Sequence, residues 1–281
     1  MMNLLDGAYK SMEAAGGWSA EMDAPSAEVV NYITLQSFVL AVVFATCQGA
    51  HEYGHYSMIQ LNKLKVSTPT LIPSILTGIT TTINRIEKPF ENRAQLAKFS
   101  LAGPLVGMIV SIVIYVFGLQ ATPLNIGEGI NNLPLLPLGI MQRSNLAVGV
   151  ANLVMGQGFV ELYSSTNESF IPLSPVAIAG FFGMVVNALA MAPYGRSDGG
   201  RTSTALFGRS GAQGISFFTS IMILFLGLIS NDAILFYFLF VTFFQGEQEI
   251  PCRDEVAEPD NTTAFLAGIS WFLMLLILLP S

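Results

Sequence analysis

Long apolar stretches without charge alternate along this chain with shorter polar segments, and these stretches predict membrane helices. A helix needs about 20 apolar residues to cross the hydrocarbon core of a bilayer, and the pattern therefore predicts an all-α polytopic membrane protein with about six transmembrane helices. The predicted spans are residues 29–61, 97–119, 174–194, 212–230, 232–246 and 263–280. Residues 29–281 are expected to form one integral membrane domain, preceded by a short extramembrane segment over residues 1–28.

Residues 64–91 interrupt the helical pattern after the first span. This segment is rich in threonine, isoleucine and proline, for example in Ser67-Thr68-Pro69 and Leu71-Ile72-Pro73. A sequence of β-branched residues interrupted by prolines forms a poor transmembrane helix. Backbone that is neither helix nor closed barrel is tolerated at membrane depth only where protein or a water-filled cavity covers it. We interpret residues 64–91 as a re-entrant loop or β-hairpin that lies beside residues 51–55.

Two glycines lie four residues apart in the second predicted span, Gly103 and Gly107. Small residues at this spacing allow two membrane helices to approach closely. Ordinary use of glycine in membrane helices explains the pair equally well, and the sequence leaves both interpretations open.

The composition agrees with a membrane protein. The chain has 281 residues, of which 52% are hydrophobic and 11% are charged, whereas soluble domains carry about 25% charged residues. The formal net charge of −7 argues against a nucleic-acid partner. Cys47 and Cys252 show no spacing pattern and are assigned no role, and the acidic stretch 247–260 is interpreted as a solvated loop.

The chemistry of the sequence centres on His51-Glu52-Tyr53-Gly54-His55, which contains both histidines of the chain. Positions i and i+4 share one face of a helix, so both imidazoles can bind one ion, and Glu52 can reach a water beside it. A catalytic zinc takes three protein ligands and keeps one position open. Since no further histidine and no cysteine pair is present, we expect a carboxylate as the third ligand.

Asp198 is the candidate for that carboxylate. It follows the third predicted span in the glycine-rich turn 193–201. An ionisable group close to lipid is costly and indicates function. An aspartate that merely caps a helix N-terminus explains the position equally well.

The distribution of cations places both candidate segments on one side of the bilayer. Lysine and arginine gather after the first and third predicted spans, whereas the connection 120–173 contains only Arg143. By the positive-inside rule, the ends of spans one and three lie on the cytosolic or stromal face. His55 and Asp198 are therefore expected on the same side, as a shared site requires.

These residues carry a family resemblance. An H-E-x-x-H motif in the first span, with a P-x-x-x-x-D-G-G turn after a later span, resembles the site-2 protease family of intramembrane zinc metalloproteases. The plastid and cyanobacterial branch, which includes the ethylene-dependent gravitropism-deficient and yellow-green proteins, is the most similar. The resemblance runs from about residue 45 to the C-terminus and includes the stretches Lys63–Ser67, Ile72–Ser74, Ser100–Leu105, Pro172–Gly180 and Phe207–Arg209.

The resemblance implies zinc bound by His51, His55 and Asp198, with Glu52 as the general base. It implies a membrane-anchored protein substrate. Since the carbonyls of a helix are already hydrogen-bonded, we hypothesise that the substrate helix unwinds and that an extended segment of it pairs with the loop after the first span. Asn187 is assigned to substrate binding. The expected location is a plastid membrane, either thylakoid or inner envelope, with the active site toward the stromal or cytosolic face.

The chain also departs from the family pattern. Eight residues before the aspartate the family usually has asparagine, but this chain has Ala190, and Ala192 and Ser197 replace leucines of the turn. These departures favour an alternative function, in which a catalytically weak or inactive relative serves as a scaffold or assembly subunit of a photosynthetic membrane complex. The four motif residues His51, Glu52, His55 and Asp198 favour the protease.

Overall fold

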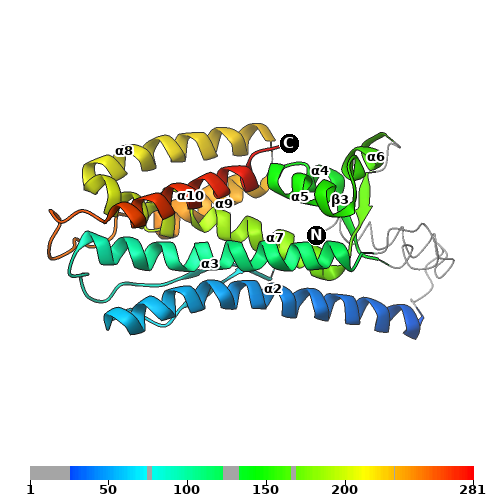
Figure 1. The fold of residues 1–281 in the computed structure, drawn as a ribbon, viewed down its shortest axis with the longest axis horizontal. Helices are drawn as coiled ribbons and strands as arrows, with labels where there is room; N and C mark the ends of the chain where they lie inside the picture. Colours follow the sequence, from blue (N-terminus) through cyan, green and yellow to red (C-terminus); the bar gives the residue numbers. More distant parts are fainter. Residues whose placement is uncertain (1–25, 75–77, 123–132, 166–168, 231) are drawn as a thin grey trace.

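The computed structural model describes residues 26–74, 78–122, 133–165, 169–230 and 232–281. The long helices lie side by side along the long axis of the molecule (Figure 1). They are α2 (Ala27–Asn62), α3 (Arg93–Gln120), α7 (Pro175–Ala190), α8 (Asp198–Ser230), α9 (Asp232–Gln245) and α10 (Asn261–Leu278). Three shorter helices, α4 (Leu138–Met141), α5 (Asn145–Met155) and α6 (Phe159–Ser165), gather at one end of the bundle (Figure 1).

A helix occupies each of the six predicted spans, but the number of membrane crossings is not confirmed. Among the described residues, α2, α3 and α10 are long and apolar enough to cross a bilayer, and α5 with α6, bent by 103°, would add a fourth crossing if the pair is one span. α7 has only 16 residues and α9 only 14, below the roughly 20 that a straight crossing needs.

α8 is interrupted at Gly208, whose φ of 70° and ψ of 175° are not helical. Its first part carries Asp198, and its second part coincides with the predicted span 212–230. Arg93 of α3 donates from Nε to the carbonyl of Ala205 (2.7 Å) and from Nη2 to that of Leu206 (2.8 Å). These are the carbonyls that a helix end leaves without partners, so Arg93 closes the first part of α8.

Two small antiparallel sheets accompany the helices, so the fold is mostly rather than entirely helical. After α2, strands β1 (Thr70–Ser74) and β2 (Gly78–Ile83) form a hairpin whose register shifts between Ile72 and Pro73. Proline has no N–H to donate to the ladder, which explains the irregularity. Strands β3 (Leu135–Pro137) and β4 (Phe170–Pro172) form the second sheet. A β-hairpin is thus present within residues 64–91, and its depth in a membrane stays a prediction.

Glycines allow α2, α3 and α7 to pack closely. A Cβ on Gly54 of α2 would overlap the backbone of Ala102 in α3, and a Cβ on Gly107 of α3 would overlap the amide of Asn187 in α7. A Cβ on Gly103 would overlap the ring of His55. Of the two interpretations of the glycine pair, close helix contact is therefore the one that the structure supports.

We expect Gly54→Ala to destabilise the fold by about 1–3 kcal/mol, because the added methyl group must displace the backbone of α3. The matched control is Gly49→Ala in the same helix, where an added Cβ meets nothing within 4 Å. That control should be neutral or stabilising by roughly 0.5–1 kcal/mol. Thermal unfolding of both variants in one detergent measures the difference. Equal unfolding midpoints would show that α2 and α3 are not in close contact at Gly54.

Candidate metal centre

The H-E-x-x-H motif lies in the C-terminal half of α2, on the face that packs against α3 and α7. His51 and His55 are 3% and 1% exposed. Their Nε2 atoms lie 3.1 Å apart. The helical spacing that the sequence predicted therefore brings the two rings together in the interior of the bundle.

Nδ1 of each ring donates a hydrogen bond to an oxygen atom. His51 Nδ1 donates to Oδ1 of Asn187 (2.7 Å), whose own amide nitrogen donates to the carbonyl of Gly183 (2.8 Å). His55 Nδ1 donates to the carbonyl of Phe99 (3.0 Å). Because Nδ1 of each ring carries the proton, Nε2 of each neutral ring offers its lone pair to the space between them.

Asp198 completes a triangle of ligand atoms. Its Oδ2 lies 3.4 Å from Nε2 of His51 and 3.4 Å from Nε2 of His55. Ligand atoms held at 2.0–2.2 Å by a tetrahedral zinc ion lie about 3.3–3.6 Å from one another. Two nitrogen lone pairs and a carboxylate oxygen that face one another repel unless a cation or proton lies between them, so both the donor set and its spacing fit zinc.

The turn before α8 directs the Asp198 carboxylate toward the rings. Ser197 has the capping role, because its Oγ accepts from the N–H of Gly200 (3.0 Å) and donates to the carbonyl of Ala192 (2.6 Å). A Cβ on Gly199 would overlap the carbonyl of Met191, so this turn requires glycine there. Because Ser197 caps α8 and Asp198 is its first residue, helix capping does not account for Asp198 or for the direction of its carboxylate.

Glu52 lies at the edge of the triangle. Its Oε1 is 4.0 Å from Nε2 of His51, and its side chain is 22% exposed, unlike the buried rings. Its Oε2 accepts a hydrogen bond from the amide of Asn84, directly after β2 (3.4 Å). Glu52 is therefore adjacent to the position of an ion and partly exposed at the surface of the protein.

Comparison with known proteins agrees with this geometry. Residues 39–230 match the family described as Peptidase family M50. The chain belongs to peptidase family M50. This is the site-2 protease family that its motifs resemble, and the predicted family is thereby confirmed.

Curated relatives of this M50 chain come from plants. The chain is 29% identical over 85% of its length to "Probable zinc metalloprotease EGY2, chloroplastic" of Arabidopsis thaliana, and 29% identical over 82% to EGY1 of the same plant. It is 30% identical over 80% of its length to the Arabidopsis "Probable zinc metallopeptidase EGY3, chloroplastic". The matches cover 41%, 40% and 39% of these relatives, so the chain spans about two fifths of their length. No solved structure matches.

Two residues around the M50 site were missed by the sequence analysis. Arg201 is 4% exposed and contacts Asp198, and Asn84 contacts Glu52. The position of Arg201 directly after Asp198-Gly199-Gly200 was a usable signal, because it follows the candidate ligand by one helical turn. The predicted position of residues 64–91 beside the site includes Asn84 but does not single it out, because only the folded hairpin brings its side chain to Glu52.

The acidic stretch 247–260 is not uniformly solvated, and the prediction of a solvated loop was wrong for Glu249. Glu249 is 4% exposed and forms an ion pair with Arg201.

Burial raises the pKa of the Cys252 thiol to about 11. Cys252 is therefore protonated at neutral pH.

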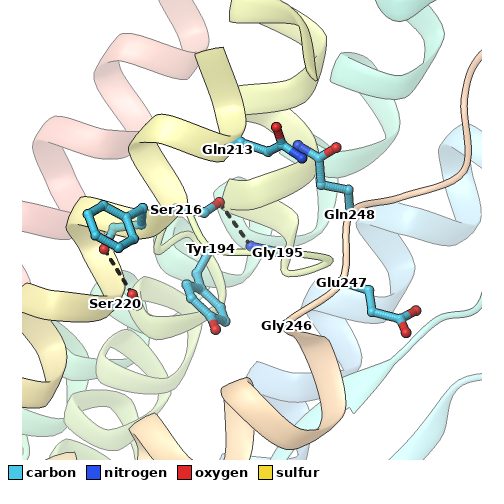
Figure 2. Close-up of a pocket in the computed structure, with 9 residues that line it drawn as sticks. Tyr194, Gly195, Gln213, Ser216, Ser220, Gly246, Glu247 and Gln248 are labelled. Atoms are coloured by element: carbon cyan, nitrogen blue, oxygen red, sulfur yellow. Dashed lines mark hydrogen bonds between the residues drawn. The ribbon is translucent and has the colours of Figure 1, made fainter. Parts of the chain in front are cut away.

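A separate hollow of about 490 Å³ lies beside the turn that precedes Asp198 (Figure 2). Ser216 of α8 accepts there from the N–H of Gly195 (3.2 Å), and Gly246, Glu247 and Gln248 pass along the other side. None of the three metal-binding candidates lines this hollow.

Asn187→Ala should weaken zinc binding about 10–100-fold, because it removes the acceptor that orients His51. Asn62→Ala is the matched control, since the Asn62 amide donates only to the carbonyl of Met58 in its own helix. Zinc dissociation constants, measured by competition with a chelating dye, test this. If both variants bind zinc like the wild type, Asn187 does not orient the ring.

Proposed function

We propose that this chain is an intramembrane zinc metalloendopeptidase that hydrolyses peptide bonds of membrane-anchored proteins. The observation that carries the proposal is the convergence of Nε2 of His51, Nε2 of His55 and Oδ2 of Asp198 at 3.1–3.4 Å from one another, beside Glu52. The zinc metalloprotease names of the curated relatives and the M50 match support it.

In this mechanism His51, His55 and Asp198 would hold the zinc ion, while Asn187 and the carbonyl of Phe99 fix the two rings. Zinc, when bound, polarises the scissile carbonyl and lowers the pKa of its water to about 7. Glu52 accepts a proton from the attacking water and then donates it to the amine of the leaving peptide. Asn187 is fully buried and has both ends of its amide occupied, which supports a role in orienting His51 rather than the predicted role in substrate binding.

The substrate is proposed to enter as an extended strand. A transmembrane helix protects its carbonyls by internal hydrogen bonds, so the segment to be cut must unwind. The β1–β2 hairpin ends one residue before Asn84, which contacts Glu52. A strand added to this hairpin would therefore lie next to the general base.

We further propose a plastid membrane, thylakoid or inner envelope, with six crossings and a re-entrant hairpin, and with the active site on the stromal or cytosolic side. The chloroplastic relatives and the apolar helices support the location. The cations after the first and third predicted spans support the orientation.

A second candidate function is a scaffold or assembly subunit of a photosynthetic membrane complex. The observation that favours it is Ala190, which lacks the amide that the family usually has at this position. Zinc binding without hydrolysis of any substrate would favour this function over the protease.

Glu52→Gln should reduce hydrolysis about 10²–10⁴-fold while zinc content stays at one ion per chain, because the amide cannot accept a proton. The probe is a single-span reporter with a helix-breaking glycine pair in its span, reconstituted with the protein in liposomes. Cleavage is followed by gel electrophoresis, and zinc by elemental analysis.

The control is Glu28→Gln in the first turn of the same helix, an exposed residue far from the motif. The Glu28→Gln variant should cleave the reporter at the same rate as the wild type. A wild type that binds no zinc, or equal cleavage by wild type and Glu52→Gln, would reject the protease.

A further inference from the structure

An ion pair between Arg201 and Glu249 lies in the interior, next to the metal centre. Both residues are 4% exposed, and Nε of Arg201 lies 2.9 Å from Oε2 of Glu249. A buried ion pair adds little to stability compared with apolar residues of the same volume, because both charges lose their hydration. Stability alone therefore does not explain why this pair is placed here.

The remaining N–H groups of Arg201 reach both halves of the site. Nη2 donates to the backbone carbonyl of Asn84 (2.6 Å), whose side chain contacts Glu52. Nη1 lies 3.5 Å from Oδ1 of Asp198. One guanidinium thus contacts the metal-binding carboxylate and the neighbour of the general base.

Arg201 is shared unequally between two carboxylates. It is 2.9 Å from Glu249 but 3.5 Å from Asp198. The other oxygen of Asp198 faces the two imidazoles. In a medium of low dielectric, a guanidinium that loses one carboxylate moves toward the other and forms a shorter, charge-assisted pair. Such a pair with Asp198 would compete with the ion for the same carboxylate.

We propose that Glu249 is a positioning residue of the metal centre, which holds Arg201 so that Asp198 remains available to the ion. The inference rests on the proposed function, since it assumes that the three ligand candidates bind a metal. Glu249 acts through Arg201 and touches neither the ion position nor the substrate.

The loop after α9 holds Glu249 firmly in place. Arg209 donates from Nη1 to the carbonyl of Glu249 (2.9 Å), and Arg196 donates from Nε to the carbonyl of Gln248 (3.0 Å). The second carboxylate oxygen of Glu249 accepts from the N–H of Ile250 (2.9 Å). Glu249 is therefore a fixed anchor for Arg201.

The test uses the full chain in detergent, with Zn²⁺ affinity and the visible absorption spectrum of bound Co²⁺ as readouts. Glu249→Gln should bind both metals about 10–100-fold more weakly and alter the Co²⁺ spectrum, because the carboxylate geometry changes. Adding Arg201→Gln should restore part of the lost affinity, since the competing charge is gone. A purely structural role for Glu249 would lower the unfolding temperature of the metal-free protein and leave affinity and spectrum unchanged.

The matched control is Glu247→Gln, two residues earlier in the same loop. Glu247 also pairs with an arginine, Arg196 (2.7 Å), but its side chain is 80% exposed and its carboxylate points away from Gly195 (Figure 2). An exposed pair contributes little, so this variant should bind metal like the wild type.

Unchanged affinity and spectrum in Glu249→Gln, or a double variant that binds more weakly than Glu249→Gln, overturns the inference. If Glu249→Gln does not fold, Glu249→Asp compared with Glu247→Asp carries the test, with weaker binding expected only for the former. A wild type that binds neither metal rejects the proposed function as well. If the wild type binds metal and Glu249→Gln binds it with the same affinity and spectrum, the inference about Glu249 is rejected while the proposed function stands.

Discussion

The close crossing of α2, α3 and α7 is the constraint on which the site depends. Where these helices meet, glycines of α3 face the ring of His55 and the amide of Asn187. Any larger side chain at Gly103 or Gly107 would occupy the space that these polar groups fill. The same close helix contact therefore also sets the orientation of the two histidine rings, so the packing of an apolar bundle positions the polar groups of the candidate metal centre.

Electrostatics sets the second condition. Asp198 and Glu249 bring two negative charges into the interior, and Arg201 brings one positive charge. Two neutral imidazoles add lone pairs but no charge. The one negative charge that remains favours a cation at the triangle of ligand atoms, and a cation there lowers the cost of burying these groups. Metal binding and folding are expected to be linked in this protein for that reason.

The departures from the family pattern have different structural meanings. Ser197 replaces a leucine of the family turn, yet it caps α8 through its hydroxyl and so supports the direction of Asp198. Ala190 removes an amide for which we find no replacement among the described contacts. The substitution at Ser197 thus leaves the candidate metal ligand Asp198 in position, whereas the substitution at Ala190 removes a polar group that the family usually has.

Much of this protein follows from its sequence, because the relevant signals are local. Runs of apolar residues located the helices, and the i, i+4 spacing of His51 and His55 placed two rings on one face, since a helix repeats every 3.6 residues. The prolines and β-branched residues after α2 predicted a non-helical segment, and the structure has a β-hairpin there.

Only the tertiary structure decided the direction of the Asp198 carboxylate, the place of Asn187 behind His51, and the burial of Glu249. Each of these depends on contacts between residues far apart in the chain, such as the 48 positions that separate Arg201 from Glu249. Helical periodicity carries no information about such pairs. In the sequence, Glu249 looks like any other acidic residue of an exposed loop. Only its contact with Arg201 of α8 shows that it is buried and paired.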